Sequence, residues 1–410
     1  MTIFASLPKW TAILALGLTL LAGGGGCEKK ESSNTGGGAG TGGGSPAPSA
    51  STDRIKIGHY GSLTGSKATF GKSTDNGIKL AVKEINAAGG VSIGGAKRMV
   101  ELVSEDTEGK AEKAGTVVTK LITKDKVSAV LGEVASSITL AAAPVAQQYG
   151  VPMITPSSTN PDVTKVGDMI FRVCFIDPFQ GYACAKFTRE NLKLDQVAVL
   201  FDQAGAYSVG LKDEYIKAFE GMGGKITSIQ AYNEGDSDFK AQLTRIRETK
   251  PQAIFVPGYY TEVANIALQA RQLGMAIPLI GGDGWDSEDL AKTAGKDIEG
   301  SYYSNHYASD QPSAEIQAFV SAYKADFGGS TPDGLAALGY DAARLLFDAM
   351  GRATSLNGKD LRDAIAATKD FRGVTGVITL NADRDAVKPA VMVQMKGGVP
   401  VYAATVEPKR

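Results

Sequence analysis

The fold is decided by two apolar runs, Val127-Ser-Ala-Val-Leu-Gly132 and Val151-Pro-Met-Ile-Thr155, because each opens directly into a loop rich in hydroxyl groups. The first run continues as Glu133-Val-Ala-Ser136-Ser137, and the second as Pro156-Ser-Ser-Thr-Asn-Pro161. Such runs are typical of buried parallel strands. Ligands of open α/β sheets bind outside the carboxyl ends of the strands, so both loops are predicted to face one site for a small polar or anionic group.

The hydroxyl residues of these loops are the first candidates for ligand binding: Ser136, Ser137, Ser157, Ser158 and Thr159. Ser136 and Ser137 stand where a helix is expected to begin, so backbone N–H groups and the helix dipole would help them to hold an anionic group. An alternative is that the two serines only cap the helix, since serine is a preferred capping residue. Two such loops after neighbouring strands favour a binding site.

Short β-rich runs alternate with helical patterns from residue 54 onward, which indicates parallel βαβ units. We predict two series of strands separated by a break near residues 170–175, so that the chain of 410 residues forms two Rossmann-like α/β lobes. The predicted strands are 55–59, 99–103, 127–131 and 151–155 in the first series, and 196–201, 225–232, 253–257, 277–281 and 300–304 in the second.

The order of elements changes after residue 304. Three helical patterns follow one another, at 313–327, 334–353 and 358–367, before strand-like segments at 376–380 and 390–395. Consecutive helices fit badly into a third βα series. We therefore expect them to pack on the lobes already formed, and the chain to cross between the lobes more than once.

The N-terminus has the pattern of an exported protein. Residues 1–26 contain an apolar stretch from Trp10 to Ala22 that is too short to span a bilayer and typical of a secretory signal peptide. Cys27 follows small residues, as at the lipidation site of a bacterial lipoprotein, although Gly24 stands where such sites usually carry leucine. We predict a lipidated Cys27, with ordinary cleavage or a free cysteine as alternatives. Residues 27–52 are rich in Gly and Ser and are predicted to form a disordered tether.

Composition argues against several classes of function. The 43 basic and 44 acidic residues nearly cancel and form no sustained basic cluster, so we expect no nucleic-acid partner. The two histidines, His59 and His306, lie in no metal-binding or nucleophile motif, so we expect no metal, no cofactor and no enzyme activity. Gly281-Gly-Asp-Gly284 follows a predicted strand but lacks the Lys-Ser/Thr ending of a phosphate loop, and its acidic Asp283 suits a cation.

Cys174 and Cys184 leave two alternatives open. Export makes a disulfide between them chemically possible. Two buried thiols are the other interpretation, since free cysteine is among the most buried residue types.

Several motifs follow one another at a characteristic spacing: Gly61-Ser-Leu-Thr-Gly65, Gly77-Ile-Lys-Leu-Ala-Val-Lys-Glu-Ile-Asn86 with Gly89-Gly90, Glu105-Asp106, the two hydroxyl-rich loops, Phe171-Arg172, Pro257-Gly-Tyr259 and Gly282-Asp-Gly284. In this order the chain resembles the periplasmic substrate-binding proteins of branched-chain amino-acid ABC transporters, the leucine/isoleucine/valine-binding family, over about residues 55–393. The resemblance implies the type I periplasmic-binding-protein fold, in which three crossovers join two α/β lobes around a central cleft. Lobe one would comprise residues 53–173 and 305–371, and lobe two residues 174–304 and 372–410.

The resemblance also implies roles for individual residues. The ligand carboxylate would bind Ser136 and nearby backbone N–H groups, and the ammonium group would bind Thr159, the Ser157 carbonyl and Asp283. Classical leucine binders often carry glutamate where this chain has Asp283, so the shorter side chain must draw its loop inward or suit another ligand. The ligand side chain would be surrounded by aromatic and apolar residues: Phe70, Val134, Tyr207, Tyr259 and Trp285.

Some of these residues also fit ordinary structural roles. Asp283 between two glycines is equally typical of a turn. Without the resemblance, Tyr207 and Trp285 are more typical of ordinary core or surface aromatic residues than of a binding site. The physical chemistry of an amino acid nevertheless matches the proposed roles. Serine hydroxyl and helix N-terminal amides suit a carboxylate, whereas a carboxylate, a hydroxyl and a carbonyl suit the three donors of an ammonium group.

We expect a tethered receptor that captures an aliphatic or branched-chain L-amino acid, closes around it and delivers it to an ABC transporter permease. The protein is expected to act as a monomer and to contact the membrane only through its lipid anchor. One alternative is a binder of an amide, urea or an aromatic acid in the same transporter class. An exported ligand-sensing receptor domain is an alternative of another class.

Overall fold

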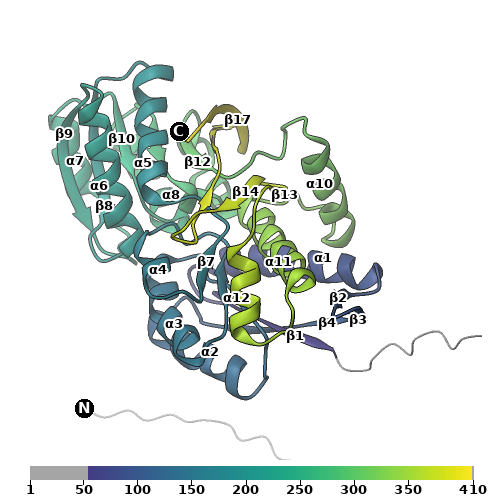
Figure 1. Ribbon diagram of the computed structural model, residues 1–410. Helices are drawn as coiled ribbons and strands as arrows, with labels where there is room; N and C mark the ends of the chain where they lie inside the picture. The colour runs from purple at the N-terminus through teal and green to yellow at the C-terminus, as the bar shows by residue number, and fades with distance from the viewer. Residues whose placement is uncertain (1–53, 409–410) are drawn as a thin grey trace, which may run out of the picture. The chain divides into compact units, whose positions relative to one another are not determined.

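The computed structural model describes residues 54–408, which form two main sheets with helices on both faces (Figure 1). The predicted signal peptide, the tether and Cys27 lie outside the described residues. We call the half of the molecule built on the first sheet lobe one and the half built on the second sheet lobe two. Within residues 54–408, no helix has the length and hydropathy needed to cross a bilayer.

The sheet of lobe one has five parallel strands in the order β4-β1-β5-β6-β7. Their bounds are Val100–Asp106 for β4, Ile55–Gly61 for β1, Val130–Leu131 for β5, Met153–Thr155 for β6 and Ile170–Arg172 for β7. Neighbouring residues of a strand point to opposite faces, so one sheet borders two cores. Ile57 and Ile154 belong to the core shared with α1 and α11, whereas Val130 and Met153 belong to the core shared with α2 and α3.

The helices of lobe one are α1 (Ala68–Ala87), α2 (Ala111–Thr123), α3 (Ser136–Tyr149), α4 (Asp162–Lys165), α10 (Ala314–Asp326), α11 (Gly334–Arg352) and α12 (Gly358–Ala366). The consecutive helices α10 to α12 thus pack on the lobe already formed, as predicted, and α11 lies along α1 (Figure 1). Glycine makes this close contact possible. A Cβ atom on Gly77 would lie 2.0 Å from the Ala336 carbonyl oxygen, and one on Gly339 would lie 2.5 Å from the Thr74 carbonyl oxygen.

The sheet of lobe two has seven strands in the order β17-β16-β12-β11-β10-β8-β9, of which the last five are parallel to one another. Their bounds are Val399–Val406 for β17, Ala390–Lys396 for β16, Tyr302–Asn305 for β12, Leu279–Gly281 for β11, Ala253–Val256 for β10, Gln196–Asp202 for β8 and Lys225–Tyr232 for β9. Strands β16 and β17 pair antiparallel at the edge beside β12.

The two faces of this sheet carry different helices. The helices are α5 (Asp177–Lys186), which continues as a π-helical turn (Phe187–Asn191), α6 (Ala206–Gly221), α7 (Lys240–Glu248), α8 (Tyr260–Gln272) and α9 (Glu288–Ala294), with 3₁₀ turns at Asp283–Trp285 and Gly295–Ile298. Val199 and Phe255 face α5 and α6, whereas Leu200 and Ile254 face α7 and α8.

One strand was not predicted, and one predicted boundary needs correction. Residues 170–172, at the end of the predicted lobe one, form β7, which completes the sheet of that lobe. Lobe two was predicted to resume at residue 372, but the small sheet β13 (Phe371–Gly373), β14 (Gly376–Leu380) and β15 (Ala386–Val387) packs in the core of lobe one. Ile378 and Leu380 contribute to that core, and Asp341 of α11 accepts the backbone N–H groups of Val374 and Thr375, both at 2.8 Å. The last crossover therefore lies between β15 and β16.

The structure also contains a hairpin that was not predicted, because its strands are too short to give a recognisable sequence pattern. Strands β2 (Val91–Ile93) and β3 (Ala96–Arg98) pair antiparallel between α1 and β4. Gly94 and Gly95 form the turn, and both have positive φ angles, 56° and 83°, which glycine adopts without strain.

Candidate functional site

Ser136 and Ser137 open helix α3, and neither caps it. Ala135 is the residue before the helix, and no side chain accepts a capping hydrogen bond there. Instead, Ser137 Oγ accepts the backbone N–H of Ala206 at 3.2 Å, at the start of α6 in lobe two. Ser136 Oγ accepts a longer hydrogen bond, 3.4 Å, from the backbone N–H of Asn160. The interpretation of these serines as helix caps is therefore wrong, and both lie where the first loop meets the second loop and the opposite lobe.

The second hydroxyl-rich loop contains one hydroxyl group with a structural role and two without partners. Ser158 Oγ lies 2.9 Å from the Glu133 carbonyl oxygen and 2.7 Å from Thr139 Oγ1, so it ties the two loops together. Ser157 and Thr159 are also buried, but their hydroxyl oxygens have no hydrogen-bond partner among residues 54–408. An unpaired buried hydroxyl group costs about 1–3 kcal/mol, so these two oxygens are available to a ligand.

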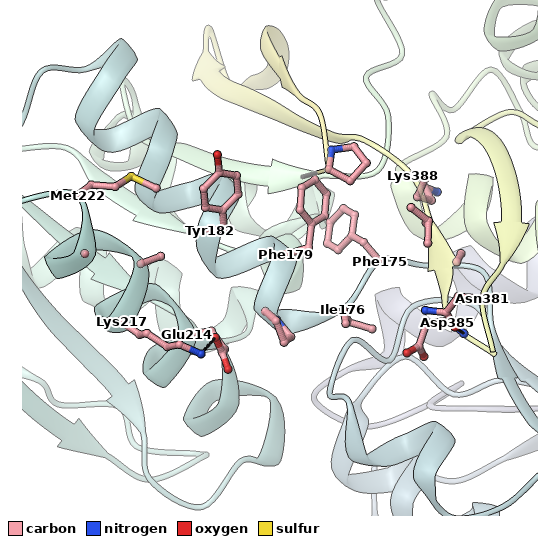
Figure 2. A pocket seen from close by; sticks show the side chains of 16 residues that line it. Phe175, Ile176, Phe179, Tyr182, Glu214, Lys217, Met222, Asn381, Asp385 and Lys388 are labelled. Carbon is pink, nitrogen blue, oxygen red and sulfur yellow. Dashed lines mark hydrogen bonds and ion pairs between the residues drawn. The ribbon is translucent and has the colours of Figure 1, made fainter. Parts of the chain in front are cut away.

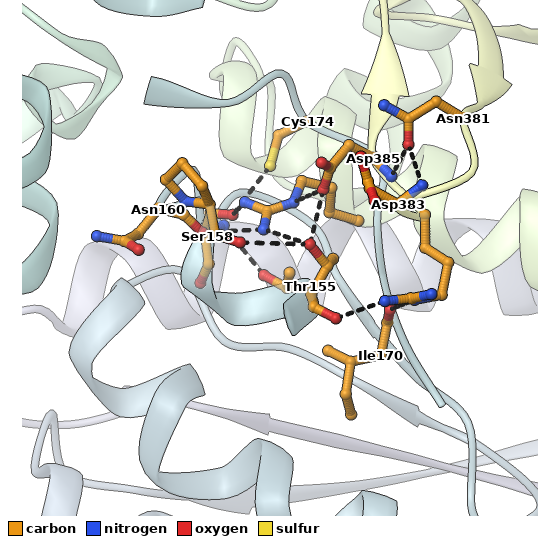
Figure 3. A network of polar contacts seen from close by, with 12 residues as sticks. Thr155, Ser158, Asn160, Ile170, Cys174, Asn381, Asp383 and Asp385 are labelled. Carbon is orange, nitrogen blue, oxygen red and sulfur yellow. Dashed lines mark hydrogen bonds and ion pairs between the residues drawn. The ribbon is translucent and has the colours of Figure 1, made fainter. Parts of the chain in front are cut away.

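Arg172, at the end of β7, holds the backbone of this second loop in place. Ser158 and Asn160 of the loop belong to one network of polar contacts with Asp385 (Figure 3). Its fully buried guanidinium donates to the Ser158 carbonyl oxygen at 2.6 Å and to the Asn160 carbonyl oxygen at 2.9 Å. Asp385, in the segment before β15, balances the charge with its Oδ1 atom 2.6 Å from Arg172 Nε. The position of the loop thus depends on the segment that leads into the last crossover.

Asp283 is the acidic centre of the site and is held by three donors. It is buried at the start of a 3₁₀ turn directly after β11. Gln180 Nε2 donates to its Oδ1 atom at 2.7 Å, and the Tyr207 hydroxyl donates to the same oxygen at 3.0 Å. His306 Nε2 lies 3.0 Å from its Oδ2 atom. A carboxylate offers about four acceptor positions, so three donors leave room for about one more.

His306 is a neutral donor in this arrangement. Burial lowers its pKa to about 4, an effect that outweighs the hydrogen bond to Asp283, which acts in the opposite direction. A neutral imidazole carries one proton, and the adjacent carboxylate favours its position on Nε2. The other nitrogen, Nδ1, is buried and has no partner in the described part of the chain.

The two glycines beside Asp283 allow the tyrosines to approach. A Cβ atom on Gly282 would lie 2.2 Å from Tyr207 Oη, and one on Gly284 would lie 3.0 Å from ring atoms of both Tyr207 and Tyr259. The Tyr207 hydroxyl also accepts the backbone N–H of Gly284 at 3.1 Å. Burial and the charge of Asp283 raise the pKa of Tyr207 well above its usual value, so its hydroxyl remains a donor.

The predicted aromatic residues form a continuous group. The rings of Tyr207 and Tyr259 stack with centroids 5.3 Å apart, and Phe70 of lobe one meets Tyr259 edge-on at 5.7 Å. Phe70 and Val134 are buried in the same apolar cluster as Trp285. Trp285 itself is fully buried and donates from Nε1 to the Val256 carbonyl oxygen at 3.0 Å, which makes it part of the core of lobe two.

Sequence reasoning missed a second acidic residue, Asp177, which begins α5 in the first crossover. Its backbone N–H donates to the Thr159 carbonyl oxygen at 2.9 Å, but neither carboxyl oxygen has a hydrogen-bond partner among the described residues. Burial raises the pKa of this carboxyl group to about 8; the nearby Thr159 hydroxyl opposes this shift, whereas the charge of Asp283 adds to it.

Gln180 and His306 were missed as well. His306 directly follows the carboxyl end of β12, so the rule that identified the hydroxyl-rich loops could have found it. Asp177 and Gln180 lie in helix α5 and do not directly follow the carboxyl end of a strand, so the same rule could not have found them. Within residues 54–408, no group of His, Cys, Asp and Glu side chains is arranged to hold a metal ion.

The disulfide alternative for Cys174 and Cys184 is wrong, because both are free, buried thiols. Cys174 Sγ lies 3.4 Å from the Ser158 carbonyl oxygen, and Cys184 Sγ lies 3.5 Å from the Gly281 carbonyl oxygen. The two side chains thus belong to the cores of different lobes. Burial raises the pKa of both thiols to about 12, so they remain protonated.

A cavity of about 560 Å³ lies apart from these residues, beside α5, α6 and the segment 381–388 (Figure 2). It is lined by Phe175, Phe179, Tyr182 and Met222 with Lys217 and Glu214 at one side. None of the predicted ligand-binding residues lines it. The candidate site is therefore defined by converging polar groups and not by this cavity.

Comparisons with known proteins agree with the fold described above. The family model described as periplasmic binding protein matches residues 54–399. The leucine-, isoleucine-, valine-, threonine- and alanine-binding protein of Pseudomonas aeruginosa is 32% identical over 330 residues, which cover 80% of this chain and 86% of that protein. A solved leucine-binding protein, LivK of Thermotoga maritima, is 38% identical with a TM-score of 0.81 and coverage of 86% of this chain and 99% of the other.

A second solved structure is the branched-chain amino-acid transporter substrate-binding protein LivJ of Streptococcus pneumoniae in complex with isoleucine. It is 36% identical with a TM-score of 0.81, and the match covers 87% of this chain and 100% of that one. A family model that matches most of the chain, together with relatives above 30% identity, leads to one conclusion. The chain belongs to the periplasmic binding protein family.

Proposed function

We propose that this protein is an extracytoplasmic receptor that captures a branched-chain or other aliphatic L-amino acid between its two lobes and delivers it to an ABC transporter permease. The observation that carries the proposal is the distribution of polar groups on the two sides of the contact between the lobes. Lobe one offers Ser136, the start of α3 and the unpaired hydroxyl groups of Ser157 and Thr159, whereas lobe two offers the carboxylate of Asp283. Both ends of a zwitterion therefore find partners.

The carboxylate of the ligand would bind at the start of α3. The N-terminal backbone N–H groups of a helix point toward an anion, and the helix dipole adds favourable charge. Among residues 54–408, Ser136 Oγ accepts one long hydrogen bond of 3.4 Å, so its own hydroxyl proton is free to be donated to a carboxylate.

The ammonium group of the ligand would bind between Thr159 and Asp283. It has three donors, which match the unpaired Thr159 hydroxyl oxygen, the Ser157 carbonyl oxygen and the one acceptor position left on Asp283. Because the donors on Asp283 are neutral, its negative charge is left to attract a cation. Phe70, Val134 and Tyr259 would surround the aliphatic side chain and stabilise it by burial.

A ligand that contacts both lobes shifts the molecule toward its closed form, because it binds that form more tightly than the open one. The closed form would be recognised by the permease. The export that membership of this family implies agrees with the signal-like N-terminus. We also propose that Cys27 carries a lipid anchor, which predicts that Cys27→Ser moves the protein from the membrane fraction to the soluble fraction.

A thermal-shift screen over the twenty amino acids, benzoate, urea and acetamide tests the proposal, because a ligand of the folded state raises Tm. We expect the largest shifts with leucine, isoleucine and valine. Two matched analogues of leucine then separate the two ends of the site: 4-methylpentanoate lacks the ammonium group, and 3-methylbutylamine lacks the carboxylate. Both should fail to shift Tm. If benzoate, urea or acetamide raises Tm and no amino acid does, the proposed amino-acid ligand is wrong, and the protein binds an aromatic acid, urea or an amide instead.

A further inference from the structure

Lys67 lies in the loop between β1 and α1 of lobe one, and its side chain is only 5% exposed. Its ammonium group forms an ion pair with the carboxylate of Glu234, which follows β9 of lobe two and is 45% exposed. Lysine is rarely buried unless it is paired. Lys67 belongs to lobe one and Glu234 to lobe two, so the ion pair exists only when the two lobes are close together.

Neutral contacts beside this ion pair join the same parts of the two lobes. The Tyr260 hydroxyl donates to the Ser66 carbonyl oxygen at 2.8 Å, and the Ser287 hydroxyl lies 3.0 Å from Thr69 Oγ1. The loop before α1 and the first turn of α1 therefore form one edge of the contact between the lobes. Lys67 contributes the charged contact at this edge.

The surface of lobe two that faces Lys67 is acidic. Glu234 lines a small recess together with Asp202, Glu262 and Tyr259. Glu262 is buried and accepts the backbone N–H of Gly235 at 3.0 Å. Three carboxylates so close together repel one another, and the approach of a lysine relieves this repulsion. The free energy of lobe closure therefore includes an electrostatic contribution from Lys67.

Lys67 also contacts an aromatic residue of the candidate site. Its Nζ atom lies 5.3 Å from the centroid of the Tyr259 ring, within the range of a cation–π interaction. Tyr259 stacks on Tyr207, whose hydroxyl donates to Asp283. A continuous series of contacts thus leads from the lysine of lobe one to the acidic centre of the site.

We infer that Lys67 is a positioning residue for ligand capture: by pairing with Glu234 and lying over Tyr259, it stabilises the closed cleft and makes ligand affinity depend on ionic strength. This inference rests on the proposed capture of a ligand between the lobes. Lys67 acts through Tyr259 and Glu234 and does not itself need to touch the ligand.

Titration calorimetry with the best aliphatic amino acid tests the inference on the full chain and on Lys67→Met, Glu234→Gln and the double variant, each at 20 and 500 mM NaCl. For a partly buried ion pair we expect each single variant to bind about tenfold more weakly at low salt, and the double variant to bind no more weakly than the singles. Wild-type affinity should fall with added salt, whereas that of the variants should change little. Lys67→Arg should retain most of the affinity.

Lys83→Met is the matched control, since Lys83 pairs with Asp326 at 2.5 Å within lobe one and should not respond to closure. Spin labels at Tyr149→Cys and Ile229→Cys, in a Cys27→Ser background, report the distance between the lobes without any ligand. Both positions are exposed, one in each lobe, and the native thiols of the described chain are buried. We expect Lys67→Met to shift the distances toward longer values.

Two results would overturn the inference. One is a loss of affinity in the double variant equal to the sum of the losses in the two single variants, and the other is a salt dependence of affinity in Lys67→Met equal to that of the wild-type chain. If no amino acid binds the wild-type chain, the proposed function fails, and the spin-label distances still decide on the role of Lys67. Identical distance distributions for the wild-type chain and Lys67→Met would then reject it.

Discussion

The Nε2 atom of His306 lies 3.0 Å from the Oδ2 atom of Asp283. The imidazole is fixed on its face by Phe175, whose ring stacks on it with centroids 3.9 Å apart. His306 belongs to the second crossover between the lobes, after β12, and Phe175 to the first, after β7. Two of the segments that connect the lobes therefore also orient the acidic residue of the candidate site.

Asp283→Asn should weaken binding of the best amino acid by about 2 to 4 kcal/mol, because the ammonium group of the ligand loses its charged partner in a buried site. Titration calorimetry measures the loss. Asp289→Asn is the control, because Asp289 is 40% exposed and pairs with Lys292 inside α9. Equal affinity for wild-type and Asp283→Asn protein would show that the ammonium group is held elsewhere.

Gly282→Ala should disrupt the site by a steric effect. The new methyl group would lie 2.2 Å from Tyr207 Oη and 2.7 Å from Leu211 Cδ2, so Tyr207 must move away from Asp283. We expect a loss of stability of about 1–3 kcal/mol in urea unfolding and a weaker affinity for the ligand. Gly221→Ala, at the end of α6, is the matched control because, among residues 54–408, no atom beyond the neighbouring part of its own helix lies within 4 Å of the new methyl group. Similar behaviour of the two variants would contradict the steric explanation.

Arg172→Met should lower the free energy of unfolding by about 3–5 kcal/mol, since it leaves Asp385 buried without its cation and removes the donors that hold the second hydroxyl-rich loop. Urea unfolding followed by circular dichroism measures the change. Adding Asp385→Asn should recover part of the loss, because the uncompensated charge is then removed. Lys359→Met, which removes an exposed i,i+4 pair with Asp363, should change stability by less than about 0.5 kcal/mol.

Asp177→Asn should change the pH dependence of stability. The pKa of Asp177 is about 8 in the folded protein and close to its ordinary value of 3.8 in the unfolded chain, so folding takes up a proton between these values. The contribution of the Asp177 proton to the free energy of unfolding is present in full below pH 4 and is lost as the pH rises through 8. Urea unfolding at several pH values between 4 and 9 should show this decline in the wild-type protein.

The difference between the wild-type protein and Asp177→Asn isolates this residue. Other groups titrate equally in both proteins, including His306, whose lowered pKa makes stability decrease toward acidic pH between about 6.5 and 4. The asparagine variant should therefore lack the decline from pH 4 to 8. A difference in stability that does not vary with pH would show that Asp177 is already ionised in the folded protein.

The fold was predictable because its signals are local. Parallel strands such as β8 are short apolar runs, and helices such as α1 have an apolar face with a helical period. The small sheet β13–β15 was assigned to the wrong lobe because its contacts with α11 depend on packing between distant segments. The short strands β7 and β15 are also shorter than any periodic pattern can define.

The candidate site was predictable only in part. Ser136, Thr159 and Asp283 follow the carboxyl ends of strands, which local sequence reveals. The partners of Asp283 are Gln180, Tyr207 and His306, and they come from α5, α6 and a crossover. No periodicity links these three positions, so their convergence could not be read from the sequence.

The sequence by itself determined two α/β lobes, the hydroxyl-rich loops after β5 and β6, and an acidic residue between glycines after β11. Tertiary structure alone decided which of these groups have partners. Ser158 Oγ lies against the Glu133 carbonyl, whereas the hydroxyl oxygens of Ser157 and Thr159 have no partner within the described part of the chain. Lys67 forms an ion pair with Glu234 across the lobes. The physical reason is that strand and helix patterns depend on neighbouring residues, whereas hydrogen bonds and ion pairs depend on how distant segments pack together.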